Sequence, residues 1–132
     1  MLVSILRQGD FLIASIHTAL DDSELLRFQH DVIAQIGGHR SRGVIIDVAA
    51  LDVLDSFGSS SLRDLSQIAR LRGATTVIVG IQPEVAFAIV QLGMHVDLHT
   101  ALDLEEGLHL LERLTGGIRS GRSTLDVLGD MP

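Results

Sequence analysis

Two kinds of hydrophobic pattern alternate along this chain of 132 residues. Short, nearly continuous apolar runs are typical of strands, and apolar residues three, four and seven positions apart are typical of helices. The strand-like runs lie at residues 2–6, 11–16, 44–48, 75–81 and 95–99. Helical spacing lies at residues 21–36, 62–72, 83–92 and 103–114. The predicted order of elements is therefore β-β-α-β-α-β-α-β-α.

This order predicts the fold class and the extent of the domain. The first two runs are joined by a short glycine-containing turn at residues 8–10, which is typical of a β-hairpin. The later strands alternate with helices, so we expect an α/β fold with a mostly parallel sheet of four to five strands and about four helices. The glycine- and serine-rich sequence after Leu114 suggests a flexible C-terminal tail over residues 115–132, which leaves one domain over residues 1–114.

Polar residues and glycines mark the expected helix ends. Asp21 stands three residues before Glu24, which is the spacing of a capping box at a helix N-terminus. The pair Gly37-Gly38 is expected to end that helix, because glycine readily adopts the conformation that follows a last turn. Thr100 together with Asp103 is expected to open the last helix.

Charge and composition narrow the classes of function. The net charge of −7 argues against a nucleic-acid or anionic-membrane partner, because such partners need clustered basic residues. The chain has no cysteine, which removes disulfides, thiolate metal sites and cysteine nucleophiles. It has no lysine either, so all 10 basic residues are arginines and no P-loop or Schiff-base lysine is present. We expect no cofactor.

The N-terminal sequence MLVSILRQGD has no basic region before its apolar run, so it reads as a strand rather than a signal peptide. No apolar run approaches the roughly 18 residues that a membrane-spanning helix needs. We therefore expect a soluble protein of the cytoplasm.

The most unusual stretch is VLDSFGSSSLRDL at residues 53–65, where a predicted strand is followed by a helix. Ser56 lies at or next to the expected N-cap, and Ser59, Ser60 and Ser61 follow within the first turns. A serine N-cap stabilises a helix by about 1 kcal/mol. One helix needs only one cap, however, and serine is a mediocre residue in a helix interior. The stretch therefore fits two interpretations, a helix cap alone or a small polar surface for a partner or a modification.

The element order and the residues around Ser56 resemble the STAS domain of bacterial anti-sigma-factor antagonists. Asp55-Ser56 is similar to the Asp-Ser pair whose serine is phosphorylated in that family, and the resemblance covers residues 2–114. A chain that begins directly at its first strand, without an N-terminal sensor domain, looks most like the small stressosome scaffolds of the RsbS type. Phe57 stands where many antagonists have a second small residue, which also favours that branch.

The resemblance implies a non-enzymatic scaffold that is the substrate of a serine/threonine switch kinase. Phosphorylation of Ser56 would release a kinase that the unmodified protein holds, and the chain would assemble with related STAS-domain scaffolds into a large oligomer. A stand-alone antagonist that binds one anti-sigma kinase is the alternative within the family. The residues expected to contact partners surround Ser56 in the sequence; they are Asp52, Asp55, Phe57, Gly58, Ser59, Ser60 and Arg63.

Other classes of function have weaker support. His95, Asp97 and His99 would share one face of a strand and could form the metal site of a small enzyme. Asp47 lies where a receiver domain carries its acid, but the lysine of that family is absent and the acidic pair Asp21-Asp22 belongs to a helix start. The chain has neither G-x-S-x-G nor G-x-G-x-x-G, the motifs of serine hydrolases and dinucleotide-binding proteins.

Overall fold

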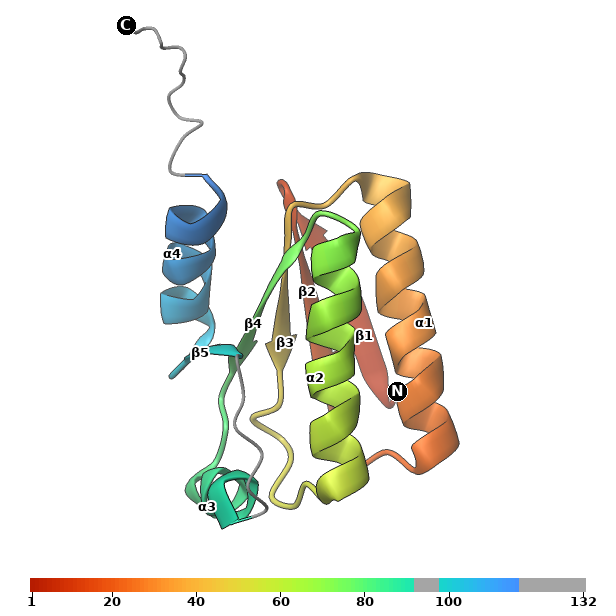
Figure 1. Cartoon of the computed structure of the whole chain (residues 1–132), viewed down its shortest axis with the longest axis vertical. Coiled ribbons are helices and arrows are strands. Elements are labelled where there is room, and N and C mark those ends of the chain that lie inside the picture. Colours follow the sequence, from red (N-terminus) through yellow and green to blue (C-terminus); the bar gives the residue numbers. More distant parts are fainter. Residues whose placement is uncertain (92–97, 117–132) are drawn as a thin grey trace, which may run out of the picture.

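The computed structural model describes residues 1–91 and 98–116. Within these residues the chain forms a five-stranded sheet and four helices (Figure 1). The strands are β1 (Val3–Gln8), β2 (Phe11–Ile16), β3 (Gly43–Asp47), β4 (Thr75–Val79) and β5 (His99–Ala101). The helices are α1 (Asp22–His39), α2 (Ser56–Leu71), α3 (Pro83–Gln91) and α4 (Leu104–Thr115). The predicted α/β class and order of elements are confirmed.

The strands follow their sequence order across the sheet, β1-β2-β3-β4-β5. β1 and β2 pair antiparallel as the predicted hairpin, with Gln8 opposite Phe11. All other neighbours pair parallel, and Ser15, Asp47 and Val79 are aligned across β2, β3 and β4. The carboxyl ends of the parallel strands therefore share one edge of the sheet, called the carboxyl edge below, and the following helices begin there.

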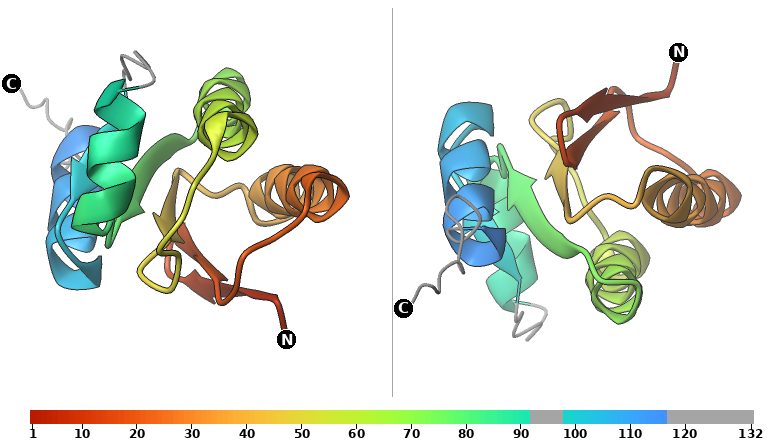
Figure 2. Two further views of the ribbon diagram at one scale, coloured as in Figure 1. Left: turned by 90° about the horizontal axis from the view of Figure 1, so that it is seen from below. Right: turned by 90° about the horizontal axis from the view of Figure 1, so that it is seen from above.

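Helices cover both faces of the sheet, so the core has two parts. α1 and α2 lie side by side on one face, and α4 lies on the other (Figures 1 and 2). Phe28 of α1 and Leu65 of α2 are buried in the first part. Leu111 of α4 packs with Ile45 and Val77 in the second. β3 is covered on both sides, which explains its continuous apolar run.

α1 begins where the sequence predicts. The Asp21 carboxylate accepts a hydrogen bond from the backbone N–H of Glu24 at 2.8 Å. In return, the Glu24 carboxylate accepts one from the backbone N–H of Asp21, also at 2.8 Å. The predicted capping box is confirmed.

The prediction that Gly37-Gly38 ends α1 is wrong. The helix continues to His39, and Arg40 follows it in the left-handed conformation with a φ of 51°. Gly37 serves a different purpose, because a Cβ there would lie 2.6 Å from Nη2 of Arg72. The glycine makes room for a guanidinium group from the end of α2.

The last strand and helix differ from the prediction in their bounds. β5 begins at His99, and residues 95–97 of the predicted strand lie outside the described residues. Thr100 pairs with Ile78 in the sheet, so it does not open α4. Asp103 alone is the N-cap, and its carboxylate accepts a hydrogen bond from the N–H of Glu106 at 2.9 Å. Most of the predicted tail, from residue 117 on, also lies outside the described residues, so its flexibility stays a prediction.

The cap of α1 predicts a pH-dependent contribution to stability. Hydrogen bonds from the N–H of Glu24 and the hydroxyl of Ser23 hold the pKa of Asp21 below its usual value of 3.8. A carboxyl pKa lowered by folding gives stabilisation that is complete above the unfolded-state pKa and is lost as the pH falls through the folded-state pKa. Between about pH 5 and pH 2, the free energy of unfolding should therefore fall more for the wild type than for Asp21→Asn, which cannot titrate.

Urea unfolding followed by circular dichroism at each pH measures this difference. The same pH dependence in both proteins would contradict the assignment.

Candidate functional site

The loop between β3 and α2 carries the candidate site, and it is fixed to the neighbouring loop. The N–H of Val48 donates to the carbonyl of Val79 at 3.0 Å, which extends the pairing of β3 with β4. The side-chain amide of Gln82 donates to the carbonyl of Ala49 at 2.7 Å. Leu54 is buried in the core. The loop therefore presents the start of α2 in a fixed orientation at the carboxyl edge.

Asp55 caps α2. Its Oδ1 accepts a hydrogen bond from the N–H of Gly58 at 2.7 Å, and its carbonyl accepts one from the N–H of Ser59 at 2.9 Å. A Cβ at Gly58 would lie 2.6 Å from Cδ1 of Leu54 and 3.3 Å from the capping oxygen, so the cap geometry favours glycine. Ser56 therefore lies next to the N-cap, which is one of the two predicted placements, and the interpretation that Ser56 itself caps the helix is wrong.

Ser56 is the first residue of α2, and it is exposed. Its hydroxyl makes no hydrogen bond to any residue within 1–91 or 98–116. The N–H groups of Ser56 and Phe57 belong to the first helical turn and have no acceptor within the helix. A hydroxyl and two hydrogen-bond donors thus lie together at the positive end of a helix dipole, where an added anion is favourable.

Exposed residues around Ser56 include several that the sequence predicts as partner contacts. Asp52 is exposed, and Phe57 has 36% of its surface exposed. Ser60 and Arg63 are partly buried further along α2. Arg63 lies 3.8 Å from the carboxylate of its neighbour Asp64, and both side chains are about half exposed, so this pair contributes little to stability.

The expectation that all three consecutive serines form a polar surface is wrong for two of them. Ser59 and Ser61 are only 5% and 4% exposed. Ser59 lies three positions before Leu62 on the buried face of the helix, and its hydroxyl has no hydrogen-bond partner among the described residues. The carbonyl of Ser61 accepts a 2.7 Å hydrogen bond from the side chain of Gln29 in α1. These small side chains allow α2 to approach its neighbours closely.

One exposed apolar residue of the site was missed from the sequence. Val53 is 71% exposed although it is aliphatic. Together with Gly58 it lines a shallow hollow that also includes Ala19 and Leu20 from the loop before α1. Val53 and Phe57 thus add apolar surface beside Ser56. A valine between acidic residues in a loop was the signal available in the sequence.

The alternative sites gain no support from the described residues. The carboxylate of Asp47 accepts a 2.9 Å hydrogen bond from the N–H of Ala49, so it stabilises the turn after β3. His99 is exposed in β5, whereas His95 and Asp97 lie outside the described residues. Within 1–91 and 98–116 no three histidine or acidic side chains are placed to hold a metal ion. In the same ranges no helix has the length and apolarity needed to cross a bilayer.

Comparison with known families identifies the domain. Residues 3–107 match the family described as the STAS domain. This chain belongs to the STAS domain family. The match runs from the first strand into α4, so it contains the loop after β3 and the whole of α2. The predicted resemblance to this family is confirmed.

Two solved structures are similar to this STAS domain over nearly their whole length. RsbS from Moorella thermoacetica, in a variant with a serine replaced by glutamate, is 34% identical with a TM-score of 0.75. That match covers 85% of this chain and 96% of the other. A chain from the architecture of the stressosome, described as a signal integration and transduction hub, is 30% identical with a TM-score of 0.70. That match covers 86% of this chain and 99% of the other.

A longer curated relative has a similar segment. The RsbT co-antagonist protein RsbRA of Bacillus subtilis (strain 168) is 29% identical over 97 residues. The matched segment is 73% of this chain but only 35% of the relative, so this STAS domain spans about a third of that protein's length.

The cap assignment predicts different effects for two neighbouring residues. Asp55→Ala removes the hydrogen bond to Gly58 and should lower the free energy of unfolding by about 1 kcal/mol. Ser56→Ala removes an exposed hydroxyl that has no partner among the described residues, so it should change the free energy of unfolding by less than about 0.5 kcal/mol. Urea unfolding of both variants and the wild type tests this. A larger loss for Ser56→Ala than for Asp55→Ala would contradict the assignment.

The buried hydroxyl of Ser59 predicts a stabilising substitution. Ser59→Ala removes an unsatisfied polar group and improves helix propensity, so it should stabilise the domain by about 0.5–1.5 kcal/mol. Ser60→Ala is the matched control, because the half-buried Ser60 should show only the smaller gain from propensity. Thermal and urea unfolding measure both. A Ser59→Ala variant less stable than the wild type would show that the hydroxyl has a partner.

Proposed function

We propose that this STAS domain is a non-enzymatic scaffold of a stressosome-type complex in the cytoplasm and is switched by phosphorylation of Ser56. In the unphosphorylated form, the start of α2 holds a serine/threonine kinase. In the phosphorylated form, it releases that kinase. The similarity to RsbS, to a chain of the stressosome and to RsbRA supports an assembly with related STAS-domain proteins.

The observation that carries this proposal is the separation of two roles between neighbouring residues. Asp55 caps the helix, which leaves the exposed hydroxyl of Ser56 without a structural task among the described residues. A kinase needs an accessible hydroxyl, and its product must not unfold the substrate. Ser56 meets both conditions, because a phosphate there would add its charge without removing the cap.

The first turn of α2 is suited to receive a negative charge. The first turns of the other three helices contain acidic side chains, whereas Ser56, Phe57 and Gly58 in the first turn of α2 are uncharged. Phosphoserine carries a charge of about −1.5 to −2 at neutral pH. The two free N–H groups and the helix dipole would stabilise that charge, so we expect the fold to persist.

The surface beside Ser56 explains why a phosphate would change binding. Val53 and Phe57 offer apolar contact, and Asp52 and Asp55 make the surroundings acidic. A phosphate would repel an acidic partner and would be costly to bury against an apolar one. A loss of about 3 kcal/mol of binding free energy weakens a complex by about a hundredfold, which is enough to release it.

Phosphorylation can be tested directly. The purified protein is incubated with ATP, Mg²⁺ and a soluble extract of its native cells, and any phosphate is located by tandem mass spectrometry. We expect one phosphate on Ser56, its absence in Ser56→Ala and its persistence in the matched control Ser60→Ala. An extract that phosphorylates other proteins but leaves Ser56 unmodified would overturn the proposed switch.

Release of the kinase is measured separately. Immobilised Ser56→Ala and Ser56→Asp proteins are exposed to the same extract, and the retained activity is assayed as phosphorylation of added wild-type protein at Ser56. Ser56→Ala should retain this activity, and Ser56→Asp should bind it about a hundredfold more weakly. Equal retention on both proteins would show that the charge at Ser56 does not control binding.

A further inference from the structure

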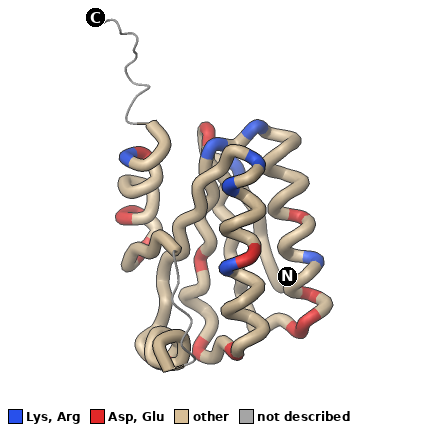
Figure 3. The backbone as a smooth tube through the Cα atoms, viewed as in Figure 1, with Lys and Arg blue, Asp and Glu red and all other residues tan. Residues whose placement is uncertain are grey.

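Charged residues separate toward the two ends of the molecule. Most acidic residues lie toward the carboxyl edge, where helices begin, and most arginines lie toward the opposite edge, where α1 and α2 end (Figure 3). We call the exposed residues Arg40, Arg70 and Arg72 the arginine end. We call the exposed residues Asp22, Asp52, Asp55 and Glu84 the acidic end.

The arginine end is formed by two helix ends that lie together. Arg40 is the C-cap of α1, Arg70 lies in the last turn of α2, and Arg72 is the C-cap of α2. A Cβ at Gly37 of α1 would lie 2.6 Å from Nη2 of Arg72, so the two helix ends are adjacent. Within residues 1–91 and 98–116 none of these three guanidinium groups forms an ion pair.

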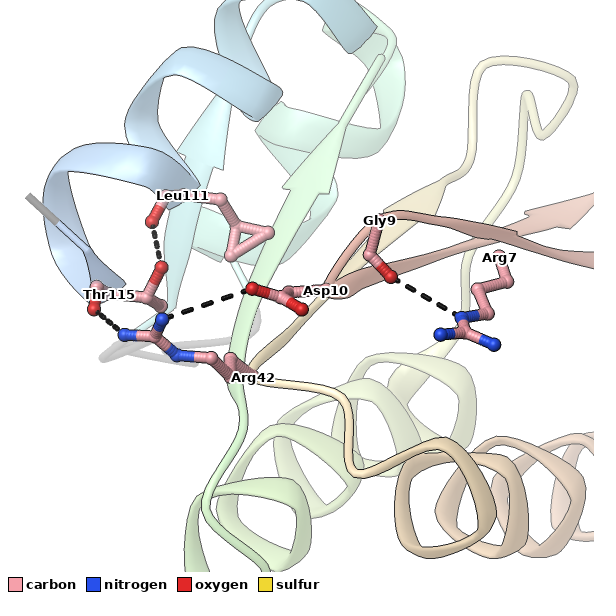
Figure 4. Close-up of polar contacts among 6 residues, drawn as sticks. All are labelled: Arg7, Gly9, Asp10, Arg42, Leu111 and Thr115. Carbon is pink, nitrogen blue, oxygen red and sulfur yellow. Dashed lines mark hydrogen bonds and ion pairs between the residues drawn. The ribbon is translucent and has the colours of Figure 1, made fainter. Parts of the chain in front are cut away.

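Nearby arginines have structural tasks that these three lack. The guanidinium of Arg42 donates to the carbonyl of Thr115 and lies 3.9 Å from the carboxylate of Asp10 (Figure 4). It thereby ties the end of α4 to the β1–β2 turn. Nε of Arg7 donates to the carbonyl of Gly9 at 3.4 Å in the same view. Within the described residues, the guanidinium groups of the arginine end therefore form no ion pair of the kind that Arg42 forms with Asp10.

The acidic end has the opposite charge and is equally accessible. Asp22 and Glu84 lie in the first turns of α1 and α3, and Asp52 and Asp55 lie in the loop before α2. In the described part of the chain these carboxylates form no ion pair. Of the four, only that of Asp55 accepts a hydrogen bond within the described residues, from the N–H of Gly58.

We propose that the arginine end docks on the acidic end of a second copy of this chain. The two surfaces lie at opposite ends of one molecule and have complementary charge, so the contact is head to tail. Such a heterologous contact leaves one free surface on each partner and generates rings or rows rather than a closed pair.

The chemistry of the two ends favours this partner. Guanidinium groups bind carboxylates in a planar, two-pronged geometry and are more weakly hydrated than ammonium groups, which suits interfaces between proteins. Head-to-tail stacking also brings the negative C-terminal ends of α1 and α2 toward the positive N-terminal ends of helices in the next copy. The net charge of −7 opposes approach to nucleic acid or an anionic membrane. Two copies also repel each other overall, so the proposed contact depends on the short-range attraction between the two oppositely charged ends.

Sedimentation velocity of the purified chain over a range of concentrations tests the contact. We expect self-association at about 50 mM salt that weakens at least tenfold at about 500 mM salt, because exposed charges are screened over a shorter distance there. Arg70→Glu/Arg72→Glu should abolish the association. Arg27→Glu/Gln67→Glu, a control pair that also adds negative charge but on the bodies of α1 and α2, should retain it.

A charge-swap experiment identifies the partner surface. Asp52→Arg/Glu84→Arg should also fail to associate alone, because its acidic end then carries two arginines beside two carboxylates and no longer attracts the arginine end. An equal mixture of this variant with Arg70→Glu/Arg72→Glu should associate again. The two arginines introduced at one end of the first variant can then pair with the two glutamates introduced at the opposite end of the second. Circular dichroism of each variant confirms that it is folded.

Three results would overturn the contact. The wild type could stay monomeric up to about 1 mM at low salt, the control pair could weaken association as much as the arginine-end pair, or the swapped variants could fail to associate as a mixture. Binding to phosphatidylserine vesicles that is lost in Arg70→Glu/Arg72→Glu, without self-association, would assign the arginine end to a membrane surface instead. The test uses neither kinase nor ATP, so its outcome is independent of the proposed phosphorylation switch.

Discussion

The parallel pairing of β2, β3, β4 and β5 is the constraint on which the other features of this molecule depend. The connecting helices therefore begin at the carboxyl edge, and α1 and α2 run back from it toward the opposite edge. Unpaired N–H groups therefore collect at one end of the molecule and unpaired carbonyl groups at the other. Asp21 and Asp55 cap the connecting helices α1 and α2, and Asp103 caps the last helix, α4, each by accepting a hydrogen bond from the N–H three residues later. The separation of charge between the two ends follows from this arrangement.

The start of α2 differs from the other helix starts in how its cap is surrounded. Asp21 and Asp103 are each followed within one turn by acidic side chains, whereas Asp55 is followed by Ser56, Phe57 and Gly58. Gly58, the third residue of the helix, lets the capping carboxylate of Asp55 and the buried side chain of Leu54 lie close to its backbone. The result is a helix start with a complete cap and no fixed charge in its first turn. A reversible charge can be added there at little cost to the fold.

Much of the fold could be predicted from the sequence because its signals are local. Apolar runs of strand length, the turn of the hairpin and the capping box at Asp21 each depend on a few neighbouring residues. The errors arose where the outcome depends on distant groups. α1 continues through Gly37, which lies against the guanidinium of Arg72, and the place of Thr100 in β5 reflects its pairing with Ile78.

The candidate site was predictable in position but not in its division of roles. The Asp-Ser pair and the strand-to-helix transition locate it from the sequence alone. Which of the two residues caps the helix depends on backbone geometry, and aspartate and serine are both good caps. The burial of Ser59 depends on which face of α2 packs against the sheet. The sequence does not reveal that face, because serines and leucines both lie on it.

Ser56 directly follows Asp55 of the acidic end, so both proposed interactions use the same part of the molecule. A kinase that contacts Val53 and Phe57 would compete there with the arginine end of a neighbouring copy. A phosphate has opposite effects on these two partners: it repels an acidic or apolar surface and attracts guanidinium groups, which bind phosphate as well as carboxylate. One modification would therefore exchange partners at this end, releasing the kinase and strengthening the contact between copies. Scaffold assembly and kinase release would then be driven by the same charge rather than by separate signals.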